Sequence, residues 1–120
     1  MKLIFIEYPT CSTCRKAKKY LKEQNISFEE RNIITNTPTK EELKQWSTIS
    51  SLPLRKFFNT AGNVYQELHL KDTIHTLSED EMLTLLSSHA MLIKRPLLIS
   101  EQEVLVGYKE DNYQKLCSTC

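Results

Sequence analysis

The sequence predicts an α/β protein built around one mixed, four-stranded sheet. A β-α-β pattern opens the chain: residues 2–7 form an apolar, β-rich run, residues 12–24 carry apolar side chains at helical spacing, and residues 27–34 again favour a strand. A β-β-α pattern closes the chain, with short apolar runs at 97–99 and 104–106 before a last helical stretch. The segment between the two patterns favours helices. We therefore expect one sheet whose two halves are separated by a helical insert.

Size and composition indicate a single domain. A chain of 120 residues can bury roughly two thirds of its surface on folding, so residues 1–120 are expected to fold without a metal or disulfide framework. The net charge of +1 gives no reason to expect direct binding of nucleic acid. The apolar run at 3–6 is too short for a signal peptide or a membrane span. We expect a cytoplasmic protein with no membrane partner, and in that reducing compartment close cysteine pairs are more often redox-active or metal-binding than structural.

The first strand and helix are predicted from their apolar patterns. Residues 2–7 do not alternate strictly, as expected of a central strand covered on both faces. Residues 8–10 end the strand, and Asn25 ends the helix that follows. The helix carries lysines on one face, and its apolar positions recur on the other: Cys14, Ala17 and Leu21.

The insert, at about residues 36–92, contains two capping boxes that mark helix starts. Thr39 with Glu42, and Ser78 with Glu81, can each satisfy two backbone amides at the first turn of a helix. Between the two helices, residues 55–58 are expected to form a short helix, followed by an irregular return. The apolar faces of the two capped helices are predicted to carry Leu43 and Trp46 in the first, and Met82, Leu85 and Leu86 in the second.

The carboxyl-terminal part is predicted as a hairpin and a helix. Four residues separate the runs at 97–99 and 104–106, Gly107 ends the pairing, and residues 109–116 can form the last helix. A β-α-β unit completed by a β-β-α unit is the thioredoxin-like arrangement. The spacing therefore predicts a thioredoxin-like fold with a helical insert between its halves.

The first of two CSTC sequences has the setting of a reactive thiol pair. Cys11 follows the central strand and opens a helix, where unpaired amides and the helix dipole favour a thiolate. Arg15 and the following lysines are expected to lower its pKa further, and Cys14 lies one turn later, within reach as a resolving thiol. The alternative is that Cys14 only packs on the buried face of the helix and Cys11 is an idle loop thiol.

Arg95-Pro96 is the second informative position. Proline before a short strand cannot donate to the ladder, and in thioredoxin-like folds a proline at this place is cis and lies beside the redox pair. Local sequence alone favours a trans bond. The fold context predicts cis.

The second CSTC sequence has the opposite setting. Cys117 and Cys120 follow the last helix, near its negative end, in a tail at 117–120 that we expect to be frayed. A joint four-cysteine zinc site, an auxiliary electron shuttle and coincidence are the alternatives for this pair. The three histidines share no metal-ligand spacing with each other or with the cysteines, so no metal site is predicted.

The runs YPTCSTCRKAKKYLKEQNISFEERNI, KRPLLI and VLVGYKED resemble the ArsC/Spx family of thioredoxin-fold proteins, which comprises glutaredoxin-dependent arsenate reductases and the Spx and MgsR transcriptional regulators. The resemblance implies that Cys11 is the nucleophile and that Arg15 and Arg95 belong to a set of arginines that binds an oxyanion. It implies no bound cofactor, only an external reductant such as glutathione, glutaredoxin or thioredoxin. The residues expected to shape the pocket are Thr10, Ser12 and Pro96.

This sequence departs from the arsenate reductase pattern at three places. The middle arginine aligns with Asn59, for which nearby Arg55 is the candidate substitute, and the last arginine is absent near residues 107–108. The histidine before the nucleophile aligns near Glu7 and Tyr8, and a carboxylate there would raise the pKa of a thiol. These departures favour chemistry centred on the cysteine pair.

We therefore predict a thiol–disulfide oxidoreductase of the arsenate reductase type with a weakened oxyanion site, acting on a small-molecule or protein thiol partner. The alternative is a redox-sensing regulator of the Spx/MgsR type, which binds the carboxy-terminal domain of the RNA polymerase α subunit and uses disulfide formation as its switch.

Overall fold

The computed structural model describes residues 3–118, and the chain divides into two compact units. The first unit comprises residues 1–32 and 95–120, and the second comprises residues 33–94. The insert was expected at about 36–92. The first unit is formed from both ends of the chain, and all four strands of the sheet lie in it.

The sheet has the strand order β2-β1-β3-β4. β1 pairs with β2 in parallel and with β3 antiparallel, and β3 pairs antiparallel with β4. This mixed sheet confirms the predicted thioredoxin-like arrangement, with β1 in a central position. The strands are β1 (Ile4–Glu7), β2 (Glu29–Asn32), β3 (Leu97–Ile99) and β4 (Val104–Val106).

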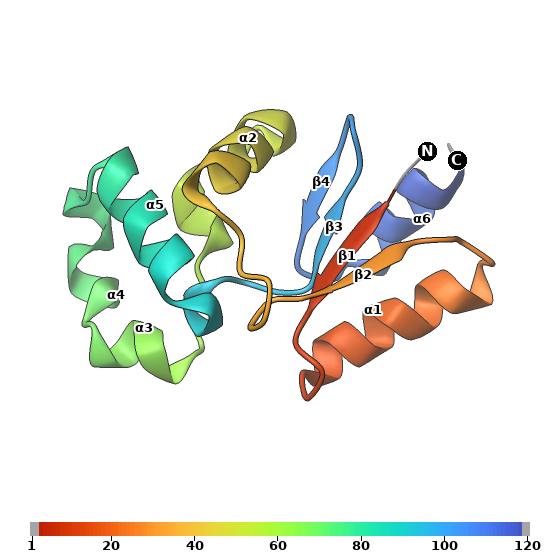
Figure 1. Cartoon of the computed structure of the whole chain (residues 1–120), viewed down its shortest axis with the longest axis horizontal. Coiled ribbons are helices and arrows are strands. Elements are labelled where there is room, and N and C mark those ends of the chain that lie inside the picture. Colours follow the sequence, from red (N-terminus) through yellow and green to blue (C-terminus); the bar gives the residue numbers. More distant parts are fainter. Residues whose placement is uncertain (1–2, 119–120) are drawn as a thin grey trace. The chain divides into compact units, whose positions relative to one another are not determined.

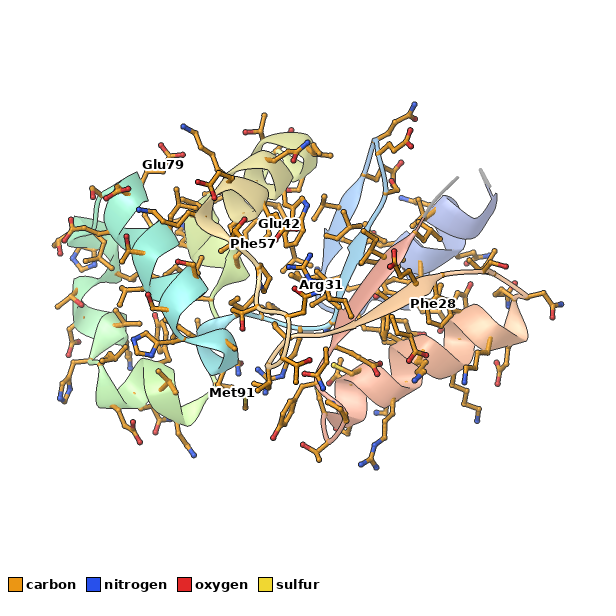
Figure 2. All side chains as sticks on the ribbon, viewed as in Figure 1. Phe28, Arg31, Glu42, Phe57, Glu79 and Met91 are labelled. Atoms are coloured by element: carbon orange, nitrogen blue, oxygen red, sulfur yellow. The ribbon has the colours of Figure 1, made fainter. Side chains whose placement is uncertain are left out.

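Two helices, α1 (Ser12–Glu23) and α6 (Glu110–Ser118), pack against one face of this sheet. Figure 1 shows α1 running alongside β1 and β2. Phe28, labelled in Figure 2, precedes β2. Its ring makes an edge-to-face contact with the ring of Phe5, with 5.6 Å between the two ring centroids. The buried core that joins these elements consists of Leu3, Phe5, Ala17, Leu21, Leu98, Tyr113 and Leu116.

Local hydrogen bonds end α1 at the predicted residue. Asn25 has a left-handed backbone, φ 57°, and its amide donates to the carbonyl of Lys22 at 3.0 Å. The amide of Ile26 donates to the carbonyl of Leu21, also at 3.0 Å. This pair of bonds is a Schellman motif, which satisfies carbonyls that the last turn leaves unpaired. The helix end places the chain for its return into β2.

The second unit is helical, apart from an isolated antiparallel bridge between Phe58 and Ile93. Both predicted capping boxes are confirmed, at Thr39 with Glu42 (labelled in Figure 2) and at Ser78 with Glu81. The predicted short helix is also present, but the irregular return is wrong, because three further helical segments follow it. The elements are α2 (Lys40–Ser50), η1 (Leu54–Phe57), α3 (Asn63–Glu67), α4 (Leu70–Thr73), η2 (Ile74–Thr76), α5 (Glu79–Ser88) and η3 (Ala90–Leu92).

The buried face of α5 differs from the prediction by one residue. Leu83 and Leu86 are buried, whereas Met82 and Leu85 are only half-buried. Apolar residues stand at both 82–83 and 85–86, so the spacing fits two adjacent faces equally well. Packing within the unit selects between them. Leu43 and Trp46 of α2 are buried as predicted.

The last helix continues to Ser118, two residues beyond its predicted end. The side chain of Cys117 and all of Cys120 lie outside the described residues. Within the part of the chain that is described, no helix combines the length and apolar character needed to cross a membrane.

Candidate thiol active site

Cys11 stands at the junction between the central strand and the first helix. β1 ends at Glu7, and Cys11 is the residue that caps α1, with extended backbone angles of φ −78° and ψ 120°. Its amide donates to the carbonyl of Tyr8 at 3.0 Å, and its carbonyl accepts from the amide of Arg15 at 3.1 Å. Its half-buried side chain therefore lies where the free amides of the helix converge.

Cys14 lies on the inner side of the first turn of α1. It is only 1% exposed, whereas Cys11 is half-buried. The Cys14 thiol donates a hydrogen bond to the sulfur of Cys11. The structure thus brings together the two predicted redox residues, with one thiol accessible and its partner enclosed.

The surroundings lower the pKa of Cys11. Partial burial acts in the opposite direction, but hydrogen bonds from the Cys14 thiol and from the amides of Cys14 and Thr13, together with the charge of Arg95, outweigh it. Each of these donors stabilises the thiolate more than the thiol. Cys11 is therefore the better nucleophile of the pair.

Burial has the opposite outcome for Cys14, raising its pKa to about 12. The neighbouring Cys11 adds to this increase, while the amide of Tyr8 and the charge of Arg95 oppose it. Near neutral pH Cys14 is consequently a protonated thiol. It can serve as a hydrogen-bond donor until Cys11 loses its negative charge.

Arg95 and Pro96 directly precede β3. The Arg95–Pro96 bond is cis, which confirms the prediction made from the fold context. Pro96 is buried, and its carbonyl accepts a hydrogen bond from the amide of Gly107 at 2.8 Å. The Arg95 guanidinium lies over the ring of Tyr8, with 5.3 Å between Cζ and the ring centroid.

Arg95, which the family resemblance named together with Arg15, supplies positive charge to the thiols and lowers the pKa of Cys11. We also expected Arg15 and the helix lysines to contribute to this effect. Arg15 is exposed, and its Nε donates to the carbonyl of Pro9 at 3.4 Å. Thr10 and Ser12 are also exposed, on either side of Cys11.

The Glu7 carboxylate, which precedes the redox loop, forms an ion pair with a lysine. It lies 3.5 Å from Lys18 Nζ, and Lys18 also contacts Glu30 at 2.8 Å. The Glu30 carboxylate, with Glu7, raises the pKa of Lys18 against the opposing effect of burial. This ion-pair network links β1, α1 and β2, and it compensates the charge of the carboxylate that precedes the redox loop.

The remaining candidate arginine belongs to the other unit. Arg55 is exposed in η1, and the amide of Asn59, which aligned with the missing arginine, donates to the carbonyl of Leu92 at 2.7 Å. Sequence reasoning placed Tyr8 in the loop that ends the first strand, near the aligned position of the family's histidine, and gave it no role in the site. An aromatic residue three positions before the first cysteine gives no signal by itself, because its contact with Arg95 depends on the fold.

Among the side chains that the structure describes, no group of three or more histidine, cysteine or acidic residues is arranged to hold a metal ion. The proposed roles of Cys117 and Cys120, including a joint zinc site, fall outside the described side chains.

Comparison with known proteins places this site in a family context. Residues 6–116 match the family described as the ArsC family. The uncharacterised protein YusI of Bacillus subtilis (strain 168) is 50% identical over 115 residues, which covers 96% of this chain and 98% of YusI. The regulatory protein MgsR of the same organism is 33% identical over 114 residues, covering 95% of this chain and 89% of MgsR. Among solved structures, a possible arsenate reductase from Streptococcus mutans UA159 is 43% identical with a TM-score of 0.85, covering 93% of this chain and 97% of that chain.

Proposed function

Since the chain belongs to the ArsC family, we propose that it is a thiol–disulfide oxidoreductase in which Cys11 is the nucleophile and Cys14 the resolving thiol. The observation that carries this proposal is the asymmetry of the pair. An accessible sulfur with a lowered pKa lies beside a buried thiol whose pKa is raised to about 12. A two-step thiol–disulfide exchange requires one thiolate that attacks the substrate and a second thiol that later attacks the mixed disulfide.

In the first step the Cys11 thiolate attacks one sulfur of a substrate disulfide. A bond forms between Cys11 and that sulfur, the substrate disulfide bond breaks, and the other substrate half leaves as a thiolate. Cys11 has then lost its negative charge. The hydrogen bond from the Cys14 thiol then no longer has a charged acceptor. One of the effects that raise the pKa of Cys14 is therefore removed.

In the second step Cys14 gives up its proton, which goes to the leaving thiolate, and attacks Cys11. The Cys11–Cys14 disulfide forms and the second substrate half leaves as a thiol. Two electrons pass from the protein to the substrate. A dithiol protein such as glutaredoxin or thioredoxin, or two equivalents of glutathione, returns them.

Arsenate is the oxyanion substrate that the family resemblance suggests. The Cys11 thiolate would form a bond to arsenic while one arsenic–oxygen bond breaks, the oxygen leaving as water after it takes a proton from solvent. Attack of Cys14 on the Cys11 sulfur would then break the sulfur–arsenic bond, form the disulfide and release arsenite, so that arsenic gains the two electrons that the pair loses, with the Cys14 proton passing to arsenite. Arg95 is suited to bind the anion, because its charge already acts on both thiols. Arg15 and Arg55 complete the proposed, weakened set, with Thr10, Ser12 and Pro96 shaping the pocket.

The test is a turnover assay on the full chain with mass spectrometry of the cysteines. Glutathione and glutaredoxin, or thioredoxin with its reductase, are supplied with arsenate or with a mixed disulfide of glutathione. Trypsin releases residues 3–15 as one peptide that contains Cys11 and Cys14 and no other cysteine. We expect turnover, and a two-hydrogen mass loss confined to this peptide after mild oxidation.

Two variants sharpen the assay. Cys11→Ser should abolish thiol-dependent turnover, whereas Cys14→Ser should accumulate a mixed disulfide on Cys11. Turnover that survives Cys11→Ser would show the proposal to be wrong. The turnover of Arg55→Gln is then compared with that of wild type on both substrates. Loss of turnover with arsenate alone supports a role of Arg55 in anion binding.

A second candidate function is supported by the likeness to MgsR over 95% of this chain. In that case the same disulfide is a switch that controls binding to the carboxy-terminal domain of the RNA polymerase α subunit. Pull-down with this domain, using reduced protein, oxidised protein and Cys11→Ser, tests it. Binding in one redox state only supports the regulator, and absence of a complex in both states rejects it.

A further inference from the structure

Tyr8 contacts both cysteines and the arginine whose charge acts on them. Its ring lies beneath Arg95, with 5.3 Å between the guanidinium carbon and the ring centroid. Its carbonyl accepts the amide hydrogen of Cys11 at 3.0 Å, and its amide donates to the sulfur of Cys14. One residue therefore links both cysteines to the cation that acts on them.

The backbone around Tyr8 fixes the position of the ring. Tyr8 directly follows β1, which pairs with a strand on each side. The last residue of β1, Glu7, is held by its pairing with β2. The hydrogen bond from Cys11 closes the turn on its other side. Tyr8 is half-buried.

The side chain of Arg95 needs such a support. An arginine has several rotatable bonds, and many of its rotamers would carry the charge away from the sulfur atoms. The face of an aromatic ring attracts a guanidinium through its quadrupole and holds it at a defined place. The attraction belongs to the ring, so a phenylalanine provides it as well.

We infer that the aromatic ring of Tyr8 is a positioning group that holds the Arg95 guanidinium beside the Cys11–Cys14 pair and thereby sets the reactivity of Cys11. The inference rests on the proposed function of this pair as a thiol exchange site. Tyr8 acts through Arg95 and not on the substrate. Its hydroxyl has no part in the effect.

The experiment compares the rate at which iodoacetamide alkylates Cys11 in reduced, full-length protein. The variants are Tyr8→Phe, which keeps the ring, and Tyr8→Leu, which removes it; Tyr8→Met is a second non-aromatic variant should Tyr8→Leu fail to fold. Alkylation is followed on the tryptic peptide 3–15, where fragment ions distinguish Cys11 from Cys14. Circular dichroism and thermal unfolding verify the fold of each variant.

Near neutral pH we expect Tyr8→Leu to slow alkylation about threefold, as loss of a moderate cation–π contact allows, and Tyr8→Phe to stay within about a factor of 1.5 of wild type. At a pH where Cys11 is fully ionised in every variant, the rates should converge. This convergence distinguishes a change in thiolate population from damage to the loop, which would slow alkylation at every pH.

A double-mutant cycle with Arg95→Met tests whether Tyr8 acts through Arg95. If it does, adding Tyr8→Leu to Arg95→Met changes the rate little, although it changes the rate of wild type. The role of Tyr8 is overturned by equal rates in wild type and Tyr8→Leu, by a Tyr8→Phe rate as low as that of Tyr8→Leu, or by a full additional loss in the double variant.

The same samples separate this inference from the proposed function. Wild-type protein that forms no disulfide within peptide 3–15 overturns the proposed function, whatever the alkylation rates show. Normal disulfide formation together with equal rates in all three proteins overturns the role of Tyr8 alone.

Discussion

The thiol of Cys14 donates a hydrogen bond to the sulfur of Cys11, from a buried position one turn into the helix that Cys11 begins. The bond stabilises the charged form of one cysteine and the neutral form of the other. Two identical side chains therefore acquire different roles from their placement on a single helix. The measurements proposed below follow from this bond and from the contacts around it.

Removal of the Cys14 donor should lower the reactivity of Cys11. Cys14→Ala deletes the hydrogen bond, so we expect several-fold slower alkylation of Cys11 at neutral pH, on the order of that expected for one bond to a charged acceptor. Cys14→Ser is the matched control, because its hydroxyl can still donate. Peptide-resolved alkylation rates measure both. Equal rates in the two variants would mean that the bond contributes nothing to the nucleophile.

Stability should fall at alkaline pH because Cys14 is buried as a neutral thiol. Its pKa is about 12 in the folded protein, against an ordinary 9.0, so above pH 9 the unfolded chain releases a proton that the folded protein retains. Raising the pH therefore favours unfolding, with a slope approaching about 1.4 kcal/mol per pH unit. Cys11 acts in the opposite direction: its pKa is lowered in the folded protein, so just above pH 9 the unfolded chain still holds part of that proton, and Cys11 offsets part of the Cys14 slope until the unfolded thiol is fully ionised.

Urea unfolding under reducing conditions, from pH 9 to about 10, measures this slope while most lysines keep their charge. Cys14→Ser is again the control, because it lacks the ionisable thiol. The difference between wild type and Cys14→Ser isolates the contribution of Cys14. Parallel pH profiles for the two proteins would contradict the prediction.

Lys18 should matter more for stability than the neighbouring Lys19. Lys18→Met leaves Glu7, whose side chain is only 13% exposed, without its cation, and we expect a loss of about 1–2 kcal/mol. Lys19 is 79% exposed and lies 3.9 Å from Glu23, so Lys19→Met should cost less than about 0.5 kcal/mol. Chemical denaturation of both variants tests the ranking, and equal losses would refute it.

Ser51 offers a stabilising substitution in the second unit. It follows α2 with a left-handed backbone, φ 60°, a conformation that costs most residues energy but not glycine. Ser51→Gly should therefore stabilise the protein by about 0.5–1 kcal/mol. Lys44→Gly, inside α2, should destabilise it by about 1 kcal/mol. A rise in the midpoint of thermal unfolding for Lys44→Gly, or a fall for Ser51→Gly, would contradict this assignment of strain.

The parts of the fold that were predicted correctly depend on local interactions. Each capping box involves residues three apart, and the end of α1 at Asn25 involves the last turn of one helix. The setting of Cys11 likewise follows from a strand that ends just before it and a helix that starts just after it. Such features are encoded within a few residues, so they can be inferred from a single sequence.

The predictions that failed required knowledge of packing. The apolar residues of α5 fit two faces equally well, and only their neighbours in the folded unit select Leu83 and Leu86. The short segments α3, α4 and η2 have too few residues to show a period. A pattern needs about two turns before it can indicate a helix.

The sequence by itself determined the fold class, the elements of the sheet and the candidate redox pair, because strand, turn and helix signals surround Cys11 directly. Only the tertiary structure decided which charges act on that pair. Arg95 is far from the thiols along the chain, and the pairing of β3 with β1 brings its charge close to them. Glu7, although close along the chain, forms an ion pair with Lys18. Electrostatic effects depend on distance in space, and distance along the chain does not reveal it.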